Sequence, residues 1–368
     1  MAISQQTPPQ QTPSLSQSQE SSNSLSSLSQ IHQPVLLDEC VQLVSTALTP
    51  ENPWVVDCTL GLAGHATAFL KAVPAARLLG IDRDQEALGL AQERMQAEGL
   101  SDRFLPVHAA FDQLDEILNA HQLNQVSAVF MDLGLSSLQI DERARGFSYS
   151  QDAPLDMRMD SSQELTAAQV LATYSLDDLT RIFKDYGEER FARPIARRVV
   201  QTRERAPLRT SSQLDRLVDA VVPKAHRAPG NPAKRVFQAL RIEVNGELDK
   251  LVSTLPQAAS HLRLGGRLVV ESYHSLEDRT VKRFMASGLK FDLPQGLPVV
   301  PEQAQPFFED LTHGALKASG QQVVSNPRSA SVRLRAVQLT RPIPAERQQE
   351  WTQTSDHSVY SHHHVGRR

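Results

Sequence analysis

The fold is decided by residues 54–65, which read WVVDCTLGLAGH. The first four residues are typical of a short buried strand that ends in an acid, Asp57. Gly61 and Gly64 follow, and glycines in such a loop let the backbone approach a ligand closely. A helix that starts after the loop can hold a carboxylate or a phosphate at its N-terminus. The dinucleotide fingerprint G-x-G-x-x-G is absent, which disfavours an enzyme that uses a nicotinamide cofactor.

Two further strand-like segments also end in an acid. Residues 77–82 end at Asp82, and residues 127–132 end at Asp132. Other strands are expected over residues 104–108, 264–271 and 331–337, with a helix over 85–98. This alternation predicts an α/β fold with a parallel, doubly wound sheet. Because ligands of such sheets bind beyond the carboxyl ends of the strands, the three acids mark the expected site.

Changes in composition divide the chain into parts. Residues 1–30 are mostly Ser, Gln, Thr and Pro, and cannot bury enough apolar surface to offset the entropy of ordering. After Gln139 about 90 residues follow with mostly helix-like, basic sequence and no strong strand pattern. The predicted parts are a disordered tail (1–30), a discontinuous α/β domain (31–142 and 236–340), an inserted helical domain (143–235) and a flexible polar tail (341–368).

Cysteine content and hydropathy exclude several classes of protein. The two cysteines, Cys40 and Cys58, rule out a disulfide scaffold and a cysteine-rich zinc or iron–sulfur site. No apolar run is long enough for a transmembrane helix, and the N-terminus lacks the features of a secretory signal. We therefore expect a cytoplasmic protein that does not contact a membrane.

Charge is unevenly distributed along the chain. Residues 181–241 contain 15 Lys or Arg and 6 Asp or Glu, a balance of +9, whereas the whole chain carries −4. A basic block in an acidic protein favours a surface that faces a polyanion, such as nucleic acid. Solvated helix faces with ion pairs are an equally good explanation of the charge alone.

The residues around the glycine loop suggest an adenosyl ligand. Asp82 lies about 20 residues beyond the loop, where an acid holds ribose hydroxyls in related sheets. Phe111 follows the third strand and could cover an adenine face, although a phenylalanine there is more often part of a core. Since the pyrophosphate fingerprint is missing, the combination favours S-adenosylmethionine.

Long sequence blocks from His32 to Ala336 resemble the bacterial MraW family of small-subunit ribosomal RNA methyltransferases. The blocks are PVLLDE (34–39), GH (64–65), GIDRD (80–84), DLGLSS (132–137), RGFS (145–148), PLDMRMD (154–160), YGEER (186–190), FQALRI (237–242), VN (244–245) and HSLEDR (274–279). The resemblance implies a class I S-adenosylmethionine-dependent methyltransferase with a Rossmann-like sheet and an inserted helical domain. It implies methylation of N4 of a cytidine in the decoding region of 16S ribosomal RNA, within the small ribosomal subunit, with S-adenosylhomocysteine as product and no metal.

The resemblance also carries over to single residues. The cofactor contacts that it implies are Ala63, Gly64, His65, Asp82, Phe111, Asp132 and Gln139. Two positions depart from the family pattern: Ala63 stands where glycine is usual, and Ala330 stands where arginine is expected. An alanine at position 63 would matter little if its φ were negative. The oligomeric state is left open, a homodimer included.

Methylation of an exocyclic amine needs orientation and a proton acceptor, and it needs no covalent intermediate. Neither cysteine is therefore expected to act as a nucleophile. Asp132 is the expected acceptor, or it positions the cofactor. His274 could relay a proton or hold a core hydrogen bond, and Asn245 could contact the cytosine edge or tie the insert to the sheet.

The insert is the expected RNA-binding part. We predict phosphate contacts from five arginines: Arg190, Arg193, Arg197, Arg198 and Arg203. The charged loop of Asp156, Met157, Arg158 and Asp160 is equally compatible with substrate positioning and with an ion-paired hinge. Two other hypotheses remain: a cofactor-fold protein that binds ribosomal RNA without catalysis, and a methyltransferase with a different substrate.

Overall fold

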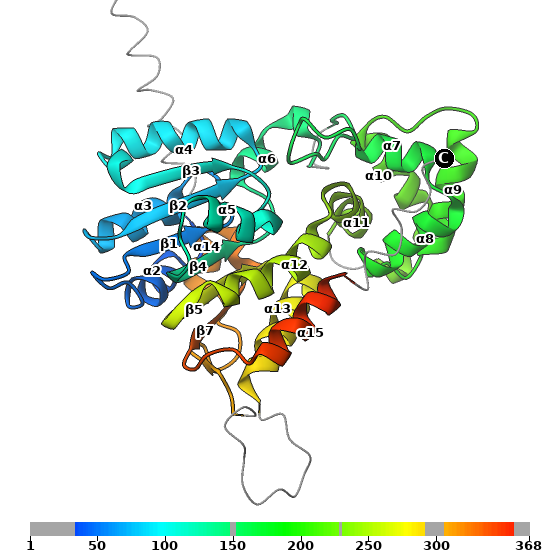
Figure 1. Ribbon diagram of the computed structural model, residues 1–368. Coiled ribbons are helices and arrows are strands. Elements are labelled where there is room, and N and C mark those ends of the chain that lie inside the picture. The colour runs from blue at the N-terminus through cyan, green and yellow to red at the C-terminus, as the bar shows by residue number, and fades with distance from the viewer. Residues whose placement is uncertain (1–33, 148–151, 228–229, 291–304, 357–368) are drawn as a thin grey trace, which may run out of the picture.

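A computed structural model describes residues 34–147, 152–227, 230–290 and 305–356. Seven strands form one sheet, with helices on both of its faces (Figure 1). The strands are β1 (Trp54–Asp57), β2 (Arg77–Asp82), β3 (Phe104–His108), β4 (Val126–Asp132), β5 (Leu262–Ser272), β6 (Phe308–Asp310) and β7 (Arg333–Leu339). The predicted α/β fold with a doubly wound sheet is confirmed.

The order of the strands is β3-β2-β1-β4-β5-β7-β6. Strands β1 to β5 pair in parallel, whereas β7 is antiparallel to both β5 and β6. Among the described strands β7 alone therefore runs against the others, so the predicted parallel, doubly wound sheet contains one antiparallel strand beside its edge.

Successive strand residues bury their side chains on opposite faces of the sheet. In β1, Val55 packs with helices α2, α3 and α4, while Val56 packs with α5, α12 and α13. The bounds of these helices are α2 (Leu37–Ser45), α3 (Gly64–Ala72), α4 (Gln85–Ala97), α5 (Leu114–Ala120), α12 (Glu247–Ser260) and α13 (Ser275–Leu289). Because both faces are covered, the central strands β1 and β4 are almost wholly buried, whereas β7, next to the edge, alternates buried and partly exposed residues.

Helix α4 shows how local sequence sets an element's ends. Asp84 accepts backbone hydrogen bonds from Glu86 and Ala87 and so caps the N-terminus. Gly99, with φ of 68°, follows the last turn in the left-handed conformation that glycine tolerates. The helix predicted over residues 85–98 is found at Gln85–Ala97.

The segment between β4 and β5 builds a second core. Helices α7 to α11 lie together at one end of the sheet (Figure 1), and their apolar residues form one cluster. Their bounds are α7 (Ala167–Thr173), α8 (Leu176–Asp185), α9 (Ala192–Arg203), α10 (Ser211–Val221) and α11 (Lys234–Asn245), preceded by the short α6 (Ser137–Asp141). Most of α11 lies in the predicted α/β segment that begins at residue 236, and its apolar residues pack in this cluster.

The C-terminal segment holds more structure than its polar sequence indicates. We expected a flexible tail from residue 341, but Ala345–Asp356 form helix α15, which packs on α12. Trp351 is buried, with its ring centroid 4.7 Å from that of Phe284 and 5.8 Å from that of Phe307. One large aromatic side chain thus anchors a helix that is otherwise polar. A further short helix, α14 (Gly320–Ser325), precedes β7.

Some predictions fall outside the described residues. They concern the N-terminal tail of residues 1–30 and the part of the C-terminal tail from position 357 onward. Within the described ranges, no helix combines the length and the apolar character that crossing a membrane requires.

Candidate active site

The loop after β1 and the end of β2 are tied together by one carboxylate. Asp82 Oδ2 accepts a hydrogen bond from the Gly61 backbone N–H at 2.7 Å, and Oδ1 accepts one from Asp84 N–H at 2.9 Å. Asp57 Oδ1 similarly accepts from Thr59 N–H at 3.0 Å. Burial raises the pKa of Asp82, and it raises that of Asp57 to about 7. These bonds hold the glycine loop open over the ends of two adjacent strands.

Ala63 and Gly64 join this loop to α3. Ala63 is fully buried and has φ of 58° and ψ of 33°, so the condition under which its methyl group would matter little is not met. A non-glycine residue is strained in this left-handed region. At Gly64, an added Cβ would lie 2.7 Å from Pro34 Cγ, so no side chain fits there. The departure at position 63 therefore carries a conformational cost.

His65, in the first turn of α3, is buried among polar and aromatic groups. Its Nε2 lies 3.0 Å from the Val35 carbonyl oxygen, and its Nδ1 lies 3.7 Å from Asp132 Oδ2. The ring centroid is 4.7 Å from that of Phe130. Burial lowers the pKa of His65, so the imidazole is neutral near pH 7. The bond to Val35 places the proton on Nε2 and leaves the Nδ1 lone pair towards Asp132.

Asp132 ends β4 at the centre of the sheet. Its backbone N–H donates to Thr59 Oγ at 2.6 Å, and its Oδ1 accepts from the Tyr273 hydroxyl at 2.8 Å. The Asp132 side chain is 30% exposed, while the neighbouring His65 is 6% exposed. Burial raises the pKa of Asp132, whereas the hydrogen bond from Tyr273 lowers it. The structure therefore presents one partly accessible, fixed carboxylate at the strand edge.

Two predicted cofactor residues lie at the ends of neighbouring elements. Gln139 is buried, and its Oε1 accepts from Ser136 N–H at 3.1 Å in a capping box at the start of α6. Phe111 is half-buried and begins the short helical turn after β3. The Ser136 hydroxyl accepts from Gln139 N–H and so caps α6. The loop, Asp82, Asp132 and the start of α6 thus lie at one edge of the sheet.

His274 and Asn245 lie in other environments. His274 caps α13, and its Nε2 lies 3.1 Å from Glu277 Oε1. The Asn245 side chain donates to the backbone oxygens of Met157 at 2.8 Å and Arg241 at 2.9 Å, and it accepts from Met159 N–H at 2.9 Å. These contacts match the alternative roles, a core hydrogen bond and a tie to the insert.

The charged loop of residues 156–160 is internally paired. Arg158 donates to both Asp156 oxygens at 2.8 Å. A second connection runs from the sheet domain, where Arg83 donates to the Asn245 backbone oxygen at 3.0 Å. Arg145 reaches Asp84 at 3.0 Å. The contacts match the ion-paired hinge better than substrate positioning.

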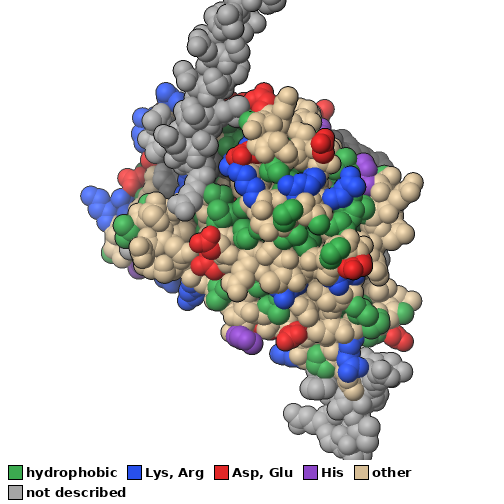
Figure 2. Space-filling model, turned by 90° about the vertical axis from the view of Figure 1, so that its left-hand side faces the viewer, with side chains coloured by type: hydrophobic (Ala, Val, Ile, Leu, Met, Phe, Trp, Pro, Cys, Tyr) green, Lys and Arg blue, Asp and Glu red, His purple; other side chains and the backbone are tan. Residues whose placement is uncertain are grey.

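The five arginines proposed for RNA differ in their surroundings. Arg190, Arg197 and Arg198 are exposed at or on α9. Arg193 is exposed and pairs with Asp177 at 3.1 Å. Arg203 instead donates to the backbone oxygens of Leu171 and Tyr174, which places it at the end of α7. The face of the sheet domain away from α9 mixes Lys or Arg with acids and apolar side chains (Figure 2).

Two side chains of the site were not predicted, Tyr273 and Glu271. Glu271 is fully buried, and its Oε2 lies 3.6 Å from His65 Nε2. The register of β4 and β5 pairs Asp132 with Glu271. Glu271, and Tyr273 two residues further on, therefore lie beside the Asp132 carboxylate. Only the pairing of β4 with β5, set by the fold, reveals this.

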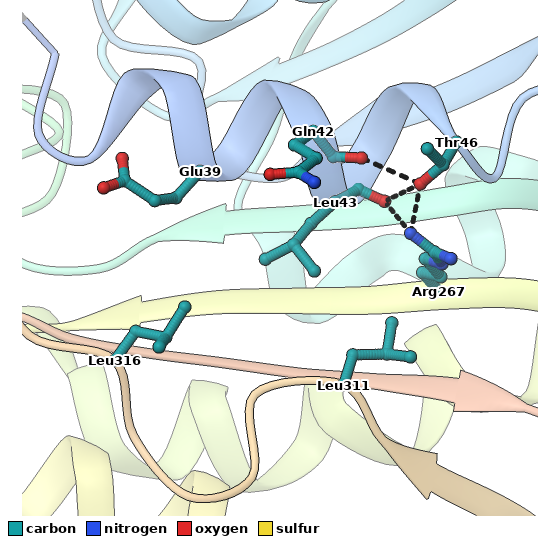
Figure 3. A pocket seen from close by; sticks show the side chains of 7 residues that line it. All are labelled: Glu39, Gln42, Leu43, Thr46, Arg267, Leu311 and Leu316. Carbon is teal, nitrogen blue, oxygen red and sulfur yellow. Dashed lines mark hydrogen bonds between the residues drawn. The ribbon is translucent and has the colours of Figure 1, made fainter.

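A cavity of about 340 Å³ lies elsewhere, between α2 and the strands β5 to β7 (Figure 3). Arg267 points into it and donates to the Leu43 carbonyl oxygen at 2.8 Å and to Thr46. Leu311 and Leu316 line the opposite wall. None of the predicted site residues lines this cavity, so the candidate site is the strand edge.

The reversed-strand sheet and the acids at its carboxyl edge define a class I methyltransferase. The family profile described as the MraW methylase family matches residues 29–340. The chain belongs to this family, and it is a methyltransferase.

Curated relatives are similar over most of their length. "Ribosomal RNA small subunit methyltransferase H" of Bifidobacterium longum (strain DJO10A) is 69% identical over 325 residues, 88% of this chain and 90% of the relative. The protein of the same name from Beutenbergia cavernae is 51% identical over 85% of this chain and 94% of the relative. Among solved structures, an rRNA methylase from Streptococcus thermophilus has a TM-score of 0.38 at 11% identity, covering 84% and 99% of the two chains. That likeness is too distant to inform function.

Proposed function

We propose that this methyltransferase acts on N4 of a cytidine in the decoding region of 16S ribosomal RNA. The observation that carries the proposal is Asp132, a partly exposed carboxylate fixed at the centre of the strand edge by Thr59 and Tyr273. The names of the relatives, which refer to small-subunit ribosomal RNA, support the choice of substrate. The exposed arginines of α9 support a nucleic-acid substrate.

The residues at the strand edge fit S-adenosylmethionine. Asp82 accepts two backbone N–H groups, and a carboxylate has about four lone-pair positions, so it can also accept ribose hydroxyls. Gly61, at φ of 50°, has a backbone conformation that suits glycine and keeps this part of the loop without a side chain. The residues that would hold the cofactor are Ala63, Gly64, His65, Asp82, Phe111, Asp132 and Gln139.

When bound, S-adenosylmethionine supplies an electrophilic methyl group, and S-adenosylhomocysteine is what remains of it. The cytidine amine is a weak nucleophile because its lone pair is delocalised into the ring. Asp132 would accept a hydrogen bond from the amine, orient the lone pair and take the proton that is lost. No residue needs to form a covalent bond with the base. Cys40 and Cys58 are buried, and burial raises the pKa of both thiols, in keeping with a structural role.

The insert would hold the RNA. Arg190, Arg197 and Arg198 are exposed and suit phosphate contacts, and the target base must leave its stack to reach the strand edge. Single-stranded or loosely structured RNA lowers the cost of that step. We propose the small ribosomal subunit in the cytoplasm as the setting.

The product identifies the function. Small subunits that lack the modification, and separately naked 16S RNA, would be incubated with the enzyme and labelled S-adenosylmethionine. Nuclease digestion and mass spectrometry would then locate the methyl group. We expect N4-methylcytidine at one decoding-region position. Methyl groups on carbon 5 or on a ribose oxygen, or label in another RNA only, would contradict the proposal.

A further inference from the structure

Glu271 is a buried carboxyl group directly beside the proposed proton acceptor, Asp132. The parallel register of β4 and β5 pairs Asp132 with Glu271, so the two side chains leave the same face of the sheet. Glu271 is 0% exposed, and neither of its carboxyl oxygens has a hydrogen-bond partner among the described residues. An ionised carboxylate in such a place would be costly.

The groups around Glu271 offer no positive charge to offset ionisation. Helix α2 contributes Glu39, whose charge raises the pKa of Glu271, and the neutral thiol of Cys40, which lowers it; β4 contributes Asp132, whose charge raises it. Helix α3 contributes His65, which is neutral and whose Nε2 proton is directed to the Val35 carbonyl oxygen. Strand β7 contributes Leu334, which is paired with Glu271.

On its own strand, Glu271 is followed two residues later by Tyr273, whose hydroxyl donates to Asp132 and not to Glu271. Two ionised carboxylates side by side in a medium of low dielectric constant repel strongly, so one of them keeps a proton. The two are not equivalent. Asp132 is 30% exposed and receives the Tyr273 hydrogen bond, which favours its charge. Glu271 is fully buried, and the Cys40 thiol beside it is only a weak donor, so the proton belongs on Glu271.

We propose that Glu271 is a positioning residue for methyl transfer, held as the neutral acid behind Asp132, so that the pair carries one proton and Asp132 is the member that ionises towards the amine. The O–H of Glu271 then faces the Asp132 carboxylate and, with Tyr273, fixes its orientation. Burial raises the pKa of Glu271 well above its ordinary value, in agreement with this arrangement. The inference rests on the proposed function through the role of Asp132.

The proposal is tested by the direction in which Glu271 variants shift the acid limb of the pH–rate profile. Replacement of Glu271 by Met (Glu271→Met) removes a donor to the Asp132 carboxylate. The acid limb of kcat/KM should then move to higher pH by about one unit. Glu271→Gln keeps a neutral donor, so its acid limb should stay near that of the wild type. If Glu271 were ionised, removal of its charge would move the limb to lower pH in both variants.

Two controls accompany this measurement. Cys40→Ala alters a neutral neighbour of Glu271 and should leave the limb in place. Binding of S-adenosylmethionine, measured by calorimetry, reports whether each variant keeps a folded site. A limb that moves equally in Glu271→Met and Glu271→Gln would overturn the role of the donor.

A second measurement determines the protonation state of Glu271 in the absence of substrate. In protein labelled with ¹³C at the glutamate carboxyl carbons, Glu271→Gln identifies the Glu271 resonance. We expect this resonance at the protonated position at pH 7, whereas titration near pH 4, as for ordinary glutamates, would overturn the proposal. If the wild type transfers no methyl group, this titration still decides the state of Glu271, so the two failures are distinguishable.

A metal ion bound at Glu271 is the alternative to a neutral acid, and metal analysis tests for it. Ligand atoms of Cys40, His65 and Glu271 lie within 4.8 Å of one another, a geometry that a cation could also use. Metal analysis of the purified protein should find no stoichiometric ion released on unfolding. A bound ion that is lost in both Cys40→Ala and Glu271→Gln would overturn the neutral acid, because a ligand carboxylate is deprotonated.

Discussion

At the scale of single residues, Ala63 combines a non-glycine side chain with a left-handed backbone conformation. Ala63 is fully buried at φ 58°, between the loop that faces the ligand and helix α3. Its Cβ meets the neighbouring carbonyl oxygen in this conformation, which glycine avoids. The strain is a property of the backbone conformation, so it does not follow from the residue type in the sequence.

Replacement of Ala63 by glycine should relieve this strain. We expect Ala63→Gly to raise the free energy of unfolding by roughly 0.5–1 kcal/mol, the relief of strain being partly offset by the entropy of glycine in the unfolded chain. Ala66→Gly, in the helical part of α3, is the matched control and should be destabilising by about 1 kcal/mol. Urea denaturation measures both. A loss of stability in Ala63→Gly would mean that position 63 is not strained.

The hydroxyl of Tyr273 should lower the pKa of the proposed base, Asp132. In the wild type, the hydrogen bond from Tyr273 to Asp132 Oδ1 lowers the pKa of that carboxyl, and Tyr273→Phe removes this bond. The acid limb of the pH–rate profile should therefore move up by about one unit. Rates measured from pH 5 to 9 at saturating cofactor check this, and an unmoved limb would show that the bond does not act on Asp132.

Asp57 gives stability a dependence on pH. Its pKa is raised to about 7 in the folded protein, against about 3.9 in an unfolded chain. The folded state then binds more protons between these values, so stability falls as pH rises from about 4 to 7. Asp57→Asn removes this titration. Its stability relative to the wild type should rise over that interval in urea melts, and a constant difference would contradict the raised pKa.

At the scale of elements, the sequence predicts the strands and helices that have a clear local pattern of apolar residues. The strands that end at Asp57, Asp82 and Asp132 are found as expected, because each is an apolar run closed by an acid. Strand β6 and helix α15 were missed. The first has three residues, and the second has a polar sequence whose position depends on distant aromatic partners.

Helix α15 should depend on a single side chain. Trp351 packs against Phe284 and Phe307, so Trp351→Ala should cost about 3 kcal/mol of unfolding free energy. Gln349→Ala, exposed on the same helix, should have a small effect. Equal and small effects in thermal or urea unfolding would indicate that the helix does not pack on the domain.

At the scale of the whole molecule, the site depends on contacts that span the chain. The acids at the strand ends could be predicted from the sequence, since the parallel fold collects them at one edge. Glu271 and Tyr273 could not, because the pairing of β4 with β5 joins segments on either side of the insert. The same holds for Asn245, whose side chain is engaged by the backbone of Met157 and Met159.

The division of labour between the insert and the sheet domain is testable by charge. Reversal of Arg197 and Arg198 to Glu should weaken binding of 16S RNA and reduce its salt dependence, while the affinity for S-adenosylmethionine stays unchanged. Lys71→Glu, exposed on α3, is the control for a change of charge elsewhere. Filter binding at several salt concentrations and calorimetry give the two affinities. Equal loss of both would remove the distinction.

The central claim is that Asp132 accepts the proton of the amine, and single-turnover methyl transfer by Asp132→Asn tests it most directly. With wild type and variant saturated with labelled cofactor and unmodified small subunits, we expect the variant to be slower by about 10²-fold or more. Its affinity for the cofactor should change only a few-fold, since Asp82 and the glycine loop are intact. A variant as fast as the wild type would contradict the claim.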